Sequence, residues 1–223
     1  MKIGLFGYGK MGKLTAQMAQ TRGHEIAIIA NGSNRLEKIP DEIDVMIDFS
    51  SGISVMEHIR LCVQAEKALI IGTTGWEEQL PKARGMIENS SIACLYAPNF
   101  SIGVYLFSQI VSFAAELINP FEQYDMSGIE FHHKAKIDSP SGTAKMLREE
   151  ILKKIPRLKD FQFSSVRCGS IPGTHTLCMD CPADIITLTH EARNRNGFAE
   201  GAVLAAEWII DKKGFFSLND MLK

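Results

Sequence analysis

The sequence predicts an α/β protein of two domains, a doubly wound parallel sheet followed by an α+β domain with a mixed sheet. Short apolar runs alternate with helical patterns over the first hundred residues, and a glycine-rich turn follows the first run. After Asn99 several strand patterns follow one another with little helix between them. Strand and helix in alternation are typical of a parallel sheet, and consecutive strands of a mixed or antiparallel one.

The first part of the chain has five apolar runs short enough to be strands, separated by patterns with helical spacing. The predicted strands are Lys2–Phe6, Glu25–Ala30, Val45–Phe49, Ala68–Ile71 and Ile92–Tyr96, and the predicted helices are Lys10–Thr21, Ser54–Ala65 and Glu77–Asn89.

The second part opens with one long apolar helix, Gly103–Ile118, and closes with another helical pattern, Gly197–Lys213. Between them, the predicted elements are the strands Gly128–Lys134, Phe161–Arg167, Thr174–Asp180 and Asp184–Glu191 and the helix Thr143–Leu152.

Composition excludes several classes of function. The net charge of -2 gives no general attraction to nucleic acid or anionic lipid. No run approaches the roughly 18 apolar residues of a membrane helix. The first residues lack the apolar core of a signal peptide, so we expect a cytoplasmic protein. Five cysteines, an odd number, favour reduced thiols over a disulfide framework.

The segment Gly7-Tyr-Gly-Lys-Met-Gly12 has the spacing G-x-G-x-x-G between a predicted strand and a predicted helix. Gly7 permits a tight turn, Gly9 lets the backbone approach a pyrophosphate, and Gly12 lets helix and strand pack closely. The helix N-terminus supplies N–H groups for phosphates. This context predicts a Rossmann-like dinucleotide-binding domain, and the alternative is a glycine turn without a ligand.

The second strand lacks the acidic residue that usually binds the adenosine ribose, because Ala30 is followed by Asn31-Gly-Ser-Asn-Arg35. Amide, hydroxyl and guanidinium groups tolerate a 2′-phosphate better than a carboxylate does, so the loop favours NADPH without excluding NADH. The alternative is a solvated loop in which Arg35 and Lys38 point into water.

Two more segments follow predicted strands, Asp48-Phe-Ser50 and Gly72-Thr-Thr-Gly75. Open α/β sheets bind ligands at the carboxyl ends of their strands, and glycines there let backbone groups approach a nicotinamide. Taken separately, each segment also fits a plain strand-to-helix turn with a Ser or Thr cap.

The densest group of polar residues runs from the strand end His132-His133 through Lys134, Lys136 and Asp138 to Ser141-Gly-Thr143. Strand alternation sends His132 and His133 to opposite faces, which argues against one shared metal site. Backbone N–H groups and hydroxyls at the start of a helix, with lysine nearby, predict a pocket for a small carboxylate. A histidine there can move a proton. The alternatives are surface histidines and an ordinary capped helix.

Cys178 and Cys181 have C-x-x-C spacing and follow His175, so a metal or redox site has to be weighed. A structural zinc site normally needs a second pair of ligands, and Thr174–Asp180 fits a strand whose alternate residues face the core. We expect buried free thiols and no metal.

The segment His132-His-Lys-Ala-Lys-Ile-Asp-Ser-Pro-Ser-Gly-Thr-Ala144 resembles the signature of 4-hydroxy-tetrahydrodipicolinate reductases, with Ser139 in place of Ala. Nearly the whole chain shares the resemblance, since the family's other landmarks occur in order. They are the N-terminal glycine motif, Asp48–Ser50, Gly72–Gly75, Ala97–Val104, Val166–Gly169, Gly173–Thr176 and Thr189-His190 through Arg195 to Phe198-Ala199.

The resemblance implies roles for individual residues. His132 is the implied catalytic acid or base, and Lys136 the proton donor and electrostatic partner. The implied substrate-carboxylate ligands are His133, Ser141, Gly142, Thr143 and Arg195. The expected cofactor-binding residues are Gly7, Tyr8, Gly9, Lys10, Met11, Gly12, Asn31, Arg35, Phe49, Gly72, Thr73, Thr74, Ala97, Pro98, Asn99 and Phe100.

The implied reaction is the NADPH- or NADH-dependent reduction of 4-hydroxy-2,3,4,5-tetrahydrodipicolinate to 2,3,4,5-tetrahydrodipicolinate in lysine and diaminopimelate biosynthesis. The family's organisation implies a dinucleotide-binding domain of residues 1–103 and 196–223, a substrate-binding and oligomerisation domain of residues 104–195, and a homotetramer.

Two other functions are compatible with the glycine motif. An amino-acid oxidoreductase resembling aspartate dehydrogenase would share the fold, because a fold does not fix a substrate. The His-His and Ser-Gly-Thr segment argues against it. A nucleotide-sensing protein without catalysis is disfavoured because both His132 and Lys136 are present.

Overall fold

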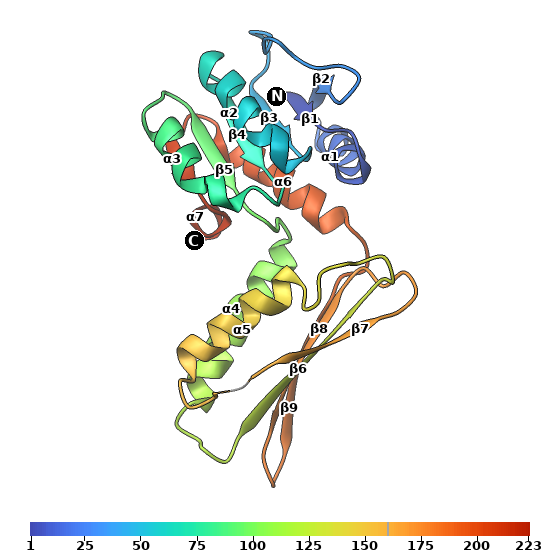
Figure 1. Cartoon of the computed structure of the whole chain (residues 1–223), viewed down its shortest axis with the longest axis vertical. Helices are drawn as coiled ribbons and strands as arrows, with labels where there is room; N and C mark the ends of the chain where they lie inside the picture. The colour runs from blue at the N-terminus through green and yellow to red at the C-terminus, as the bar shows by residue number, and fades with distance from the viewer. Residues whose placement is uncertain (160) are drawn as a thin grey trace. The chain divides into compact units, whose positions relative to one another are not determined.

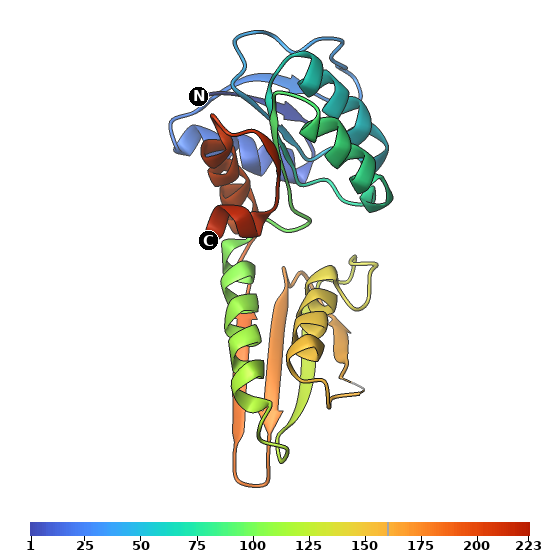
Figure 2. The same cartoon turned by 90° about the vertical axis from the view of Figure 1, so that its left-hand side faces the viewer.

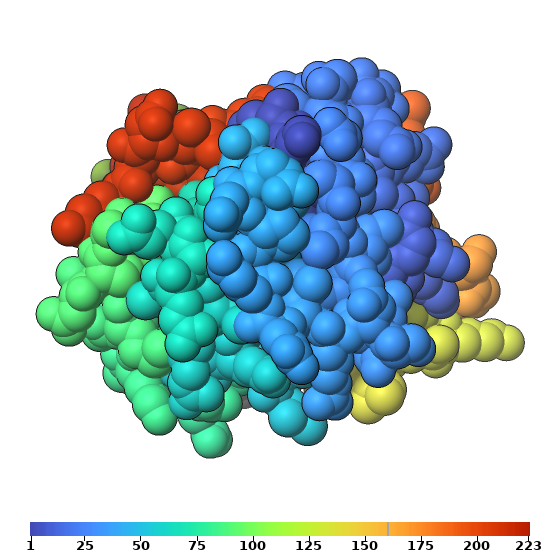
Figure 3. All heavy atoms as spheres, turned by 90° about the horizontal axis from the view of Figure 1, so that it is seen from above, coloured from blue at the N-terminus to red at the C-terminus, as the bar shows by residue number. Residues whose placement is uncertain are grey.

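The computed structural model describes residues 1–159 and 161–223. The chain divides into two compact units, the first of residues 1–101 and 196–223 and the second of residues 102–195 (Figure 1). The boundaries fall within two residues of those expected from the sequence. The C-terminal segment thus belongs to the same unit as the N-terminal strands, and Figure 3 shows it (red) beside them (blue) on one surface.

The first unit is built on a six-stranded, fully parallel sheet with the order β10-β5-β4-β3-β1-β2. Its strands are β1 (Lys2–Phe6), β2 (Glu25–Ala30), β3 (Val45–Asp48), β4 (Ala68–Ile71), β5 (Ala93–Tyr96) and β10 (Gly214–Phe216). Its helices are α1 (Lys10–Thr21), α2 (Gly52–Gln64), η1 (Glu77–Gln79), α3 (Leu80–Glu88), α6 (Asn196–Ile209) and α7 (Leu218–Leu222).

Helices cover both faces of this sheet, with α2 and α3 on one side and α1 and α6 on the other (Figure 2). The central strand β3 is buried along its whole length because both of its faces are covered. In the sheet, β2 lies on one side of β1, and β3, the next strand in the sequence, lies on the other side of β1. The strand order therefore reverses at β1, which places a ligand crevice at the carboxyl ends of β1 and β3.

The second unit is a four-stranded mixed sheet with the order β7-β6-β8-β9, in which only β6 and β7 are parallel. Its elements are α4 (Ile102–Ile118), β6 (Asp125–His132), α5 (Gly142–Lys154), β7 (Phe163–Arg167), β8 (Thr174–Asp180) and β9 (Ile185–Glu191). Strand β6 buries alternate residues, from Met126 to His132, as a sheet with one covered face does.

The core of the second unit lies between this sheet and the two helices. Phe107 and Val111 of α4 and Leu147 of α5 pack against Leu177 and Met179 of β8. The predicted mixed sheet is thus confirmed, as is the predicted parallel sheet of the first unit.

The C-terminal part of the chain differs from the prediction. The helix expected to reach Lys213 ends at Ile209, and Gly214–Phe216 forms the edge strand β10 beside β5. Within the described part of the chain, no helix is long and apolar enough to cross a membrane.

Candidate active site

A cavity of about 820 Å³ lies in the first unit where the sequence predicts a dinucleotide. Its lining comes from the residues after β1, β2 and β3, at the point where the strand order reverses. Six of the predicted cofactor residues line it: Gly7, Tyr8, Gly9, Asn31, Arg35 and Phe49. Lys10, Met11 and Gly12 follow directly in the first turn of α1.

The three glycines of the motif have the geometry that a close phosphate requires. Gly7 has φ +90°, and a Cβ placed there would lie 2.3 Å from the Phe49 carbonyl oxygen. A Cβ at Gly12 would lie 2.3 Å from the Gly7 carbonyl oxygen, whereas a Cβ at Gly9 would meet nothing within 4 Å. Gly7 and Gly12 therefore hold the turn against the helix, and Gly9 leaves open space beside the helix N-terminus. The residues fit a pyrophosphate.

A buried carboxylate lies beneath the rim of this cavity. Asp48 is fully buried, and its Oδ1 accepts hydrogen bonds from the Ser50 amide (2.9 Å), the Ser50 hydroxyl (2.6 Å) and the Thr73 hydroxyl (2.8 Å). Its Oδ2 lies 2.7 Å from His58 Nδ1, and the His58 ring stacks on Phe6 with centroids 3.9 Å apart. Asp48 thus joins the loops that follow β3 and β4.

The loop after β2 is held by its own first residue. Asn31 Oδ1 accepts hydrogen bonds from the amides of Ser33 (2.9 Å) and Asn34 (3.1 Å). Arg35 is exposed and lines the cavity with Lys13, and the lining also includes Glu57. Lys13 of α1 and Arg35 of the loop after β2 thus bring two cations to the cavity, and the sequence lacks the ribose-binding acid in this loop.

The remaining predicted cofactor residues lie further along the sheet, after β4 and β5. Gly72 lets the Phe49 ring pack on its backbone, since a Cβ there would lie 2.1 Å from the ring. Thr73 is buried in the Asp48 network, and Thr74 is exposed. After β5 come the buried Ala97, Pro98, Asn99, which accepts from the Ser101 amide (2.8 Å), and the buried Phe100.

The second unit places the predicted catalytic residues at the end of β6. His132 is the last residue of the strand and is buried. Lys136 lies on the following loop, with its Nζ 2.7 Å from Asp138 Oδ1. Partial burial acts to raise the pKa of Asp138, but the hydrogen bond and charge of Lys136 outweigh it and hold that pKa below its ordinary value.

The helix α5 begins where the sequence predicts a carboxylate pocket. Ser141 is its N-cap, and the Ser141 hydroxyl accepts a hydrogen bond from the Ala144 amide at 3.1 Å. The Ser141 amide donates to Glu130 Oε1 at 3.0 Å, so this amide already has a partner inside the protein. Gly142 is exposed and Thr143 half-buried, and both lie in the first turn.

His133 directly follows the last residue of β6 and is half-buried. Its Nε2 lies 3.4 Å from Nη2 of Arg195, the last residue of the second unit. The fold therefore brings together two of the predicted carboxylate ligands that are 62 residues apart.

Three buried or half-buried residues next to His132 were not predicted as site residues. Glu130 precedes His132 on the same face of β6, Arg167 ends β7, and His175 lies on β8 opposite Glu130. Arg167 Nη2 donates to Glu130 Oε1 (3.0 Å) and to the Asp138 carbonyl (2.6 Å). Arg167 and His175 belong to segments noted in the sequence and Glu130 to a predicted strand, but only the pairing of the strands reveals their contacts.

Glu130, His132 and His175 offer ligand atoms that all lie within 4.8 Å of one another. Such a set can hold a metal ion. The Arg167 guanidinium already places a positive charge on the same carboxylate, so we interpret the set as two histidines beside a carboxylate whose charge is compensated by Arg167.

The expectation for the C-x-x-C cysteines needs one correction. Cys178 and Cys181 are free, but both are partly exposed. The alternation of β8 buries His175, Leu177 and Met179 and turns Cys178 to the other face.

Comparison with known proteins identifies both parts of the chain. Residues 1–100 match the family model for the N-terminus of dihydrodipicolinate reductase, and residues 103–222 match the model for its C-terminus. A 4-hydroxy-tetrahydrodipicolinate reductase of Christiangramia forsetii is 37% identical over 100% of this chain and 98% of its own length. One from Acinetobacter baumannii is 31% identical over 99% and 97%.

Among solved structures, a dipicolinate-bound dihydrodipicolinate reductase from Paenisporosarcina sp. TG-14 has a TM-score of 0.79 and 24% identity, with 97% of both chains covered. A diaminopimelate dehydrogenase of C. glutamicum in complex with DAP has a TM-score of 0.57 and 11% identity, with 100% of this chain and 95% of that chain covered. At such identities these likenesses show the fold alone.

The expected fold, reductase function and nicotinamide cofactor are confirmed by these findings together. The roles of the individual site residues stay predictions. On the two family models and on relatives matched over nearly their whole length, this chain belongs to the dihydrodipicolinate reductase family.

Proposed function

We propose that this chain reduces 4-hydroxy-tetrahydrodipicolinate to tetrahydrodipicolinate with NADPH. We further propose that His132 and Lys136 transfer the proton that this reaction requires. The observation that carries the assignment of roles is the end of β6. There the buried His132 is the last residue of the strand, Lys136 lies on the following loop, and this loop leads to the start of α5.

The substrate is a dicarboxylate, and the second unit offers cations and helix N–H groups to bind it. His133 and Arg195 form one pair, and Gly142 and Thr143 lie in the first turn of α5, where the helix dipole favours an anion. Lys136 already contacts Asp138, but an ammonium has three donors and can bind a substrate oxygen as well. These contacts offset the repulsion of a dianion by a chain of net charge -2.

Loss of the 4-hydroxyl group as water would leave a conjugated, electron-poor imine, and the reduced nicotinamide, when bound, would supply a hydride to it. The electrons displaced onto the ring then require a proton. We assign the supply of this proton to Lys136, on the loop, and His132, at the strand end. Burial lowers the pKa of His132, while the nearby Glu130 carboxylate acts to raise it.

The preference for NADPH rests on the cavity of the first unit. Lys13 and Arg35 line it, and Asn31 uses its side-chain oxygen in the turn. The Arg35→Ala substitution should raise the KM for NADPH by at least about tenfold and the KM for NADH much less, because only NADPH carries a 2′-phosphate. Equal effects on the two cofactors would contradict the preference.

The roles of His132 and Lys136 are tested by steady-state kinetics. The substrate is freshly made by condensing pyruvate with aspartate semialdehyde, and the loss of NADPH absorbance is followed. His132→Ala and Lys136→Ala should each lower kcat by at least about tenfold, the usual scale for general acid–base groups.

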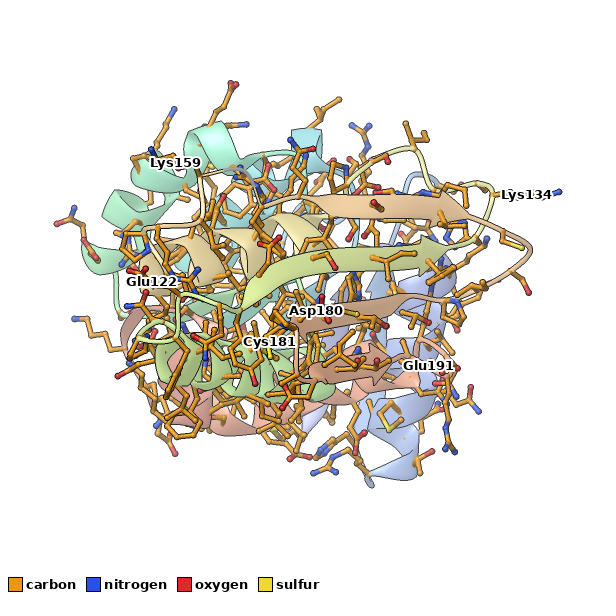
Figure 4. All side chains as sticks on the ribbon, turned by 90° about the horizontal axis from the view of Figure 1, so that it is seen from below. Glu122, Lys134, Lys159, Asp180, Cys181 and Glu191 are labelled. Carbon is orange, nitrogen blue, oxygen red and sulfur yellow. The ribbon has the colours of Figure 1, made fainter. Side chains whose placement is uncertain are left out.

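Lys134 provides the matched control. It is exposed at the end of the sheet and points away from it (Figure 4), so Lys134→Ala should keep the wild-type kcat. A wild-type kcat in both test variants would refute the assigned roles. A wild-type protein that is inactive with both NADPH and NADH would refute the assignment as a reductase.

The second unit also supports the expected homotetramer. Its exposed large apolar residues on α4 and β9 are Leu106, Ile110, Phe113, Leu117, Ile185 and Ile186. Large exposed apolar side chains repeated along one helix are typical of association sites. Light scattering at micromolar concentration should give four times the chain mass, and a monomer would contradict the assembly.

A location in the cytoplasm stays a prediction.

A further inference from the structure

Glu130 is the most deeply buried charged group near the proposed catalytic residues. Its side chain is fully buried on β6. One oxygen, Oε1, accepts hydrogen bonds from the Ser141 amide (3.0 Å), the Ser165 hydroxyl (2.7 Å) and Arg167 Nη2 (3.0 Å). Burial alone would raise the pKa of Glu130, but these donors outweigh it and lower the pKa to about 2. Glu130 is therefore ionised at neutral pH.

The other oxygen faces two histidines. Glu130 Oε2 lies 3.5 Å from His132 Nδ1 and 3.4 Å from His175 Nε2. Neither Glu130 Oε2 nor His132 Nδ1 forms a hydrogen bond within the described part of the chain, although both atoms are buried. A buried carboxylate oxygen and a buried ring nitrogen at this separation need only a small movement to form a charge-assisted hydrogen bond.

The opposite nitrogen of the same ring faces a glycine. A Cβ at Gly173 would lie 3.0 Å from His132 Nε2, closer than an ordinary contact. The absence of a side chain there leaves room beside Nε2. The two nitrogens of His132 thus have different surroundings, one facing a fixed negative charge and the other facing a backbone with no side chain.

We propose that Glu130 is a positioning residue that acts through His132: its Oε2 holds the proton of the neutral imidazole on Nδ1 and leaves Nε2 as the nitrogen that exchanges a proton. This inference rests on the proposed role of His132. A ring nitrogen bonded to a carboxylate is the protonated one, and the hydrogen bond of one nitrogen decides the state of the other.

Other charged groups also face His132, and they fix the direction of the expected pKa change. Arg167 comes from β7, His175 from β8, and Lys136 and Asp138 from the loop. The charges of Lys136 and Arg167 lower the pKa of His132, and those of Glu130 and Asp138 raise it, with burial as the largest cause of its net lowering. Removing the Glu130 charge should therefore lower the pKa of His132 further.

The experiment is an NMR titration of the ligand-free protein with ¹⁵N-labelled histidine, in which the His132 signals are assigned with His132→Gln. In the wild type, the neutral ring should carry its proton on Nδ1. In Glu130→Gln, this tautomer should lose its dominance, the His132 titration should move to lower pH, and kcat should fall at least about tenfold.

Ser165→Ala is the matched control, because it removes a donor from the other oxygen of the same carboxylate and leaves the charge in place. It should keep the wild-type tautomer. Three outcomes would overturn the proposal: a wild-type ring protonated on Nε2, a Glu130→Gln titration equal to that of the wild type, or an equal change in Ser165→Ala.

The wild-type tautomer decides the matter even if Glu130→Gln does not fold. The NMR result also needs no turnover. An inactive wild type would therefore refute the proposed function and leave the inference on Glu130 open to its own test.

Discussion

Each unit of this chain contains a fully buried carboxylate near the end of a strand, Asp48 on β3 and Glu130 on β6. The two are stabilised differently. Asp48 receives donors on both oxygens, from one backbone amide, two hydroxyls and a histidine. Glu130 receives a guanidinium and two neutral donors on one oxygen, while the other has no hydrogen bond in the described residues.

The difference separates a structural carboxylate from one placed to act on a neighbour. A carboxylate whose oxygens are all bonded ties loops together, as Asp48 does for the residues after β3 and β4. A carboxylate with a free oxygen beside two histidines biases their protonation. An unsatisfied buried oxygen is also costly, so it is expected only where it has a function.

Among the variants that test this difference between the two carboxylates, Arg167→Leu should have the largest effect on stability. The guanidinium is the cation that compensates Glu130, and its loss leaves a buried charge with neutral donors alone. The variant should destabilise the second unit by about 3 kcal/mol, the scale for breaking a buried ion pair. Amide hydrogen exchange followed by mass spectrometry measures this for peptides of residues 102–195.

Thr73→Val serves as the comparison in the first unit. It removes one hydroxyl from Asp48, and its cost should be about 1 kcal/mol, seen in peptides of residues 1–101. A larger loss in Thr73→Val than in Arg167→Leu would show that the two carboxylates do not differ as described.

A smaller effect is expected from His175, the second histidine beside Glu130. Burial, with the nearby His132, lowers the pKa of His175 to about 4 from an ordinary 6.5. The unfolded chain therefore binds more protons than the folded chain between these values, and stability falls as pH falls through this range. Because of His175, lowering the pH from 7 to 5 should reduce the free energy of unfolding by about 2 kcal/mol.

Urea unfolding of the wild type and His175→Gln at the two pH values measures this contribution. The variant should lose less stability between pH 7 and pH 5 than the wild type. An equal loss in both proteins would place the pH dependence elsewhere.

The sequence predicted most of the fold because local patterns determine it. Apolar runs and glycine turns located the first five strands to within one or two residues, whereas β10 was missed. That strand has three half-buried residues shortly after a helix, and only its pairing with β5 makes it a strand. Long-range pairing of this kind leaves no local signal.

The same limit applies to the site. His132 and Lys136 lie within one segment and were predicted, but Glu130, Arg167 and His175 meet through the register of three strands. His132 is paired with Arg167 on β7, and Glu130 with His175 on β8. Cys178 shows the converse error. The alternation of β8 was predicted, but which of its faces is buried was not.

The Gly173→Ala substitution should lower kcat by about tenfold, which corresponds to an increase of roughly 1.4 kcal/mol in the activation barrier. The new methyl group would lie 3.0 Å from His132 Nε2, and the backbone φ of +154° is one that side chains rarely adopt. The His132 ring must move away from Gly173 and leave its present position, so kcat should fall while the KM for NADPH stays unchanged. A wild-type kcat in this variant would mean that Nε2 is not the reacting nitrogen.

The smallest effect should come from an acidic group with less burial than either carboxylate. Glu207 of α6 binds Arg22 at 2.8 Å and His24 at 2.7 Å, beside α1. The hydrogen bond from Arg22, with that from His24, lowers the pKa of Glu207 to about 2 from 4.5. This stabilisation is therefore present above pH 4.5 and is lost as pH falls toward 2.

Because the three side chains are partly exposed, solvent and salt screen the cluster, and Glu207→Gln should cost no more than about 1 kcal/mol. The two tryptophans, Trp76 and Trp208, both lie in the first unit, so their fluorescence reports its unfolding in urea. The difference between Glu207→Gln and the wild type should shrink in 1 M salt, whereas the destabilisation by Arg167→Leu should persist, because salt screens buried pairs much less. A salt-independent loss in Glu207→Gln would mean that exposure does not separate this cluster from the buried Glu130 network.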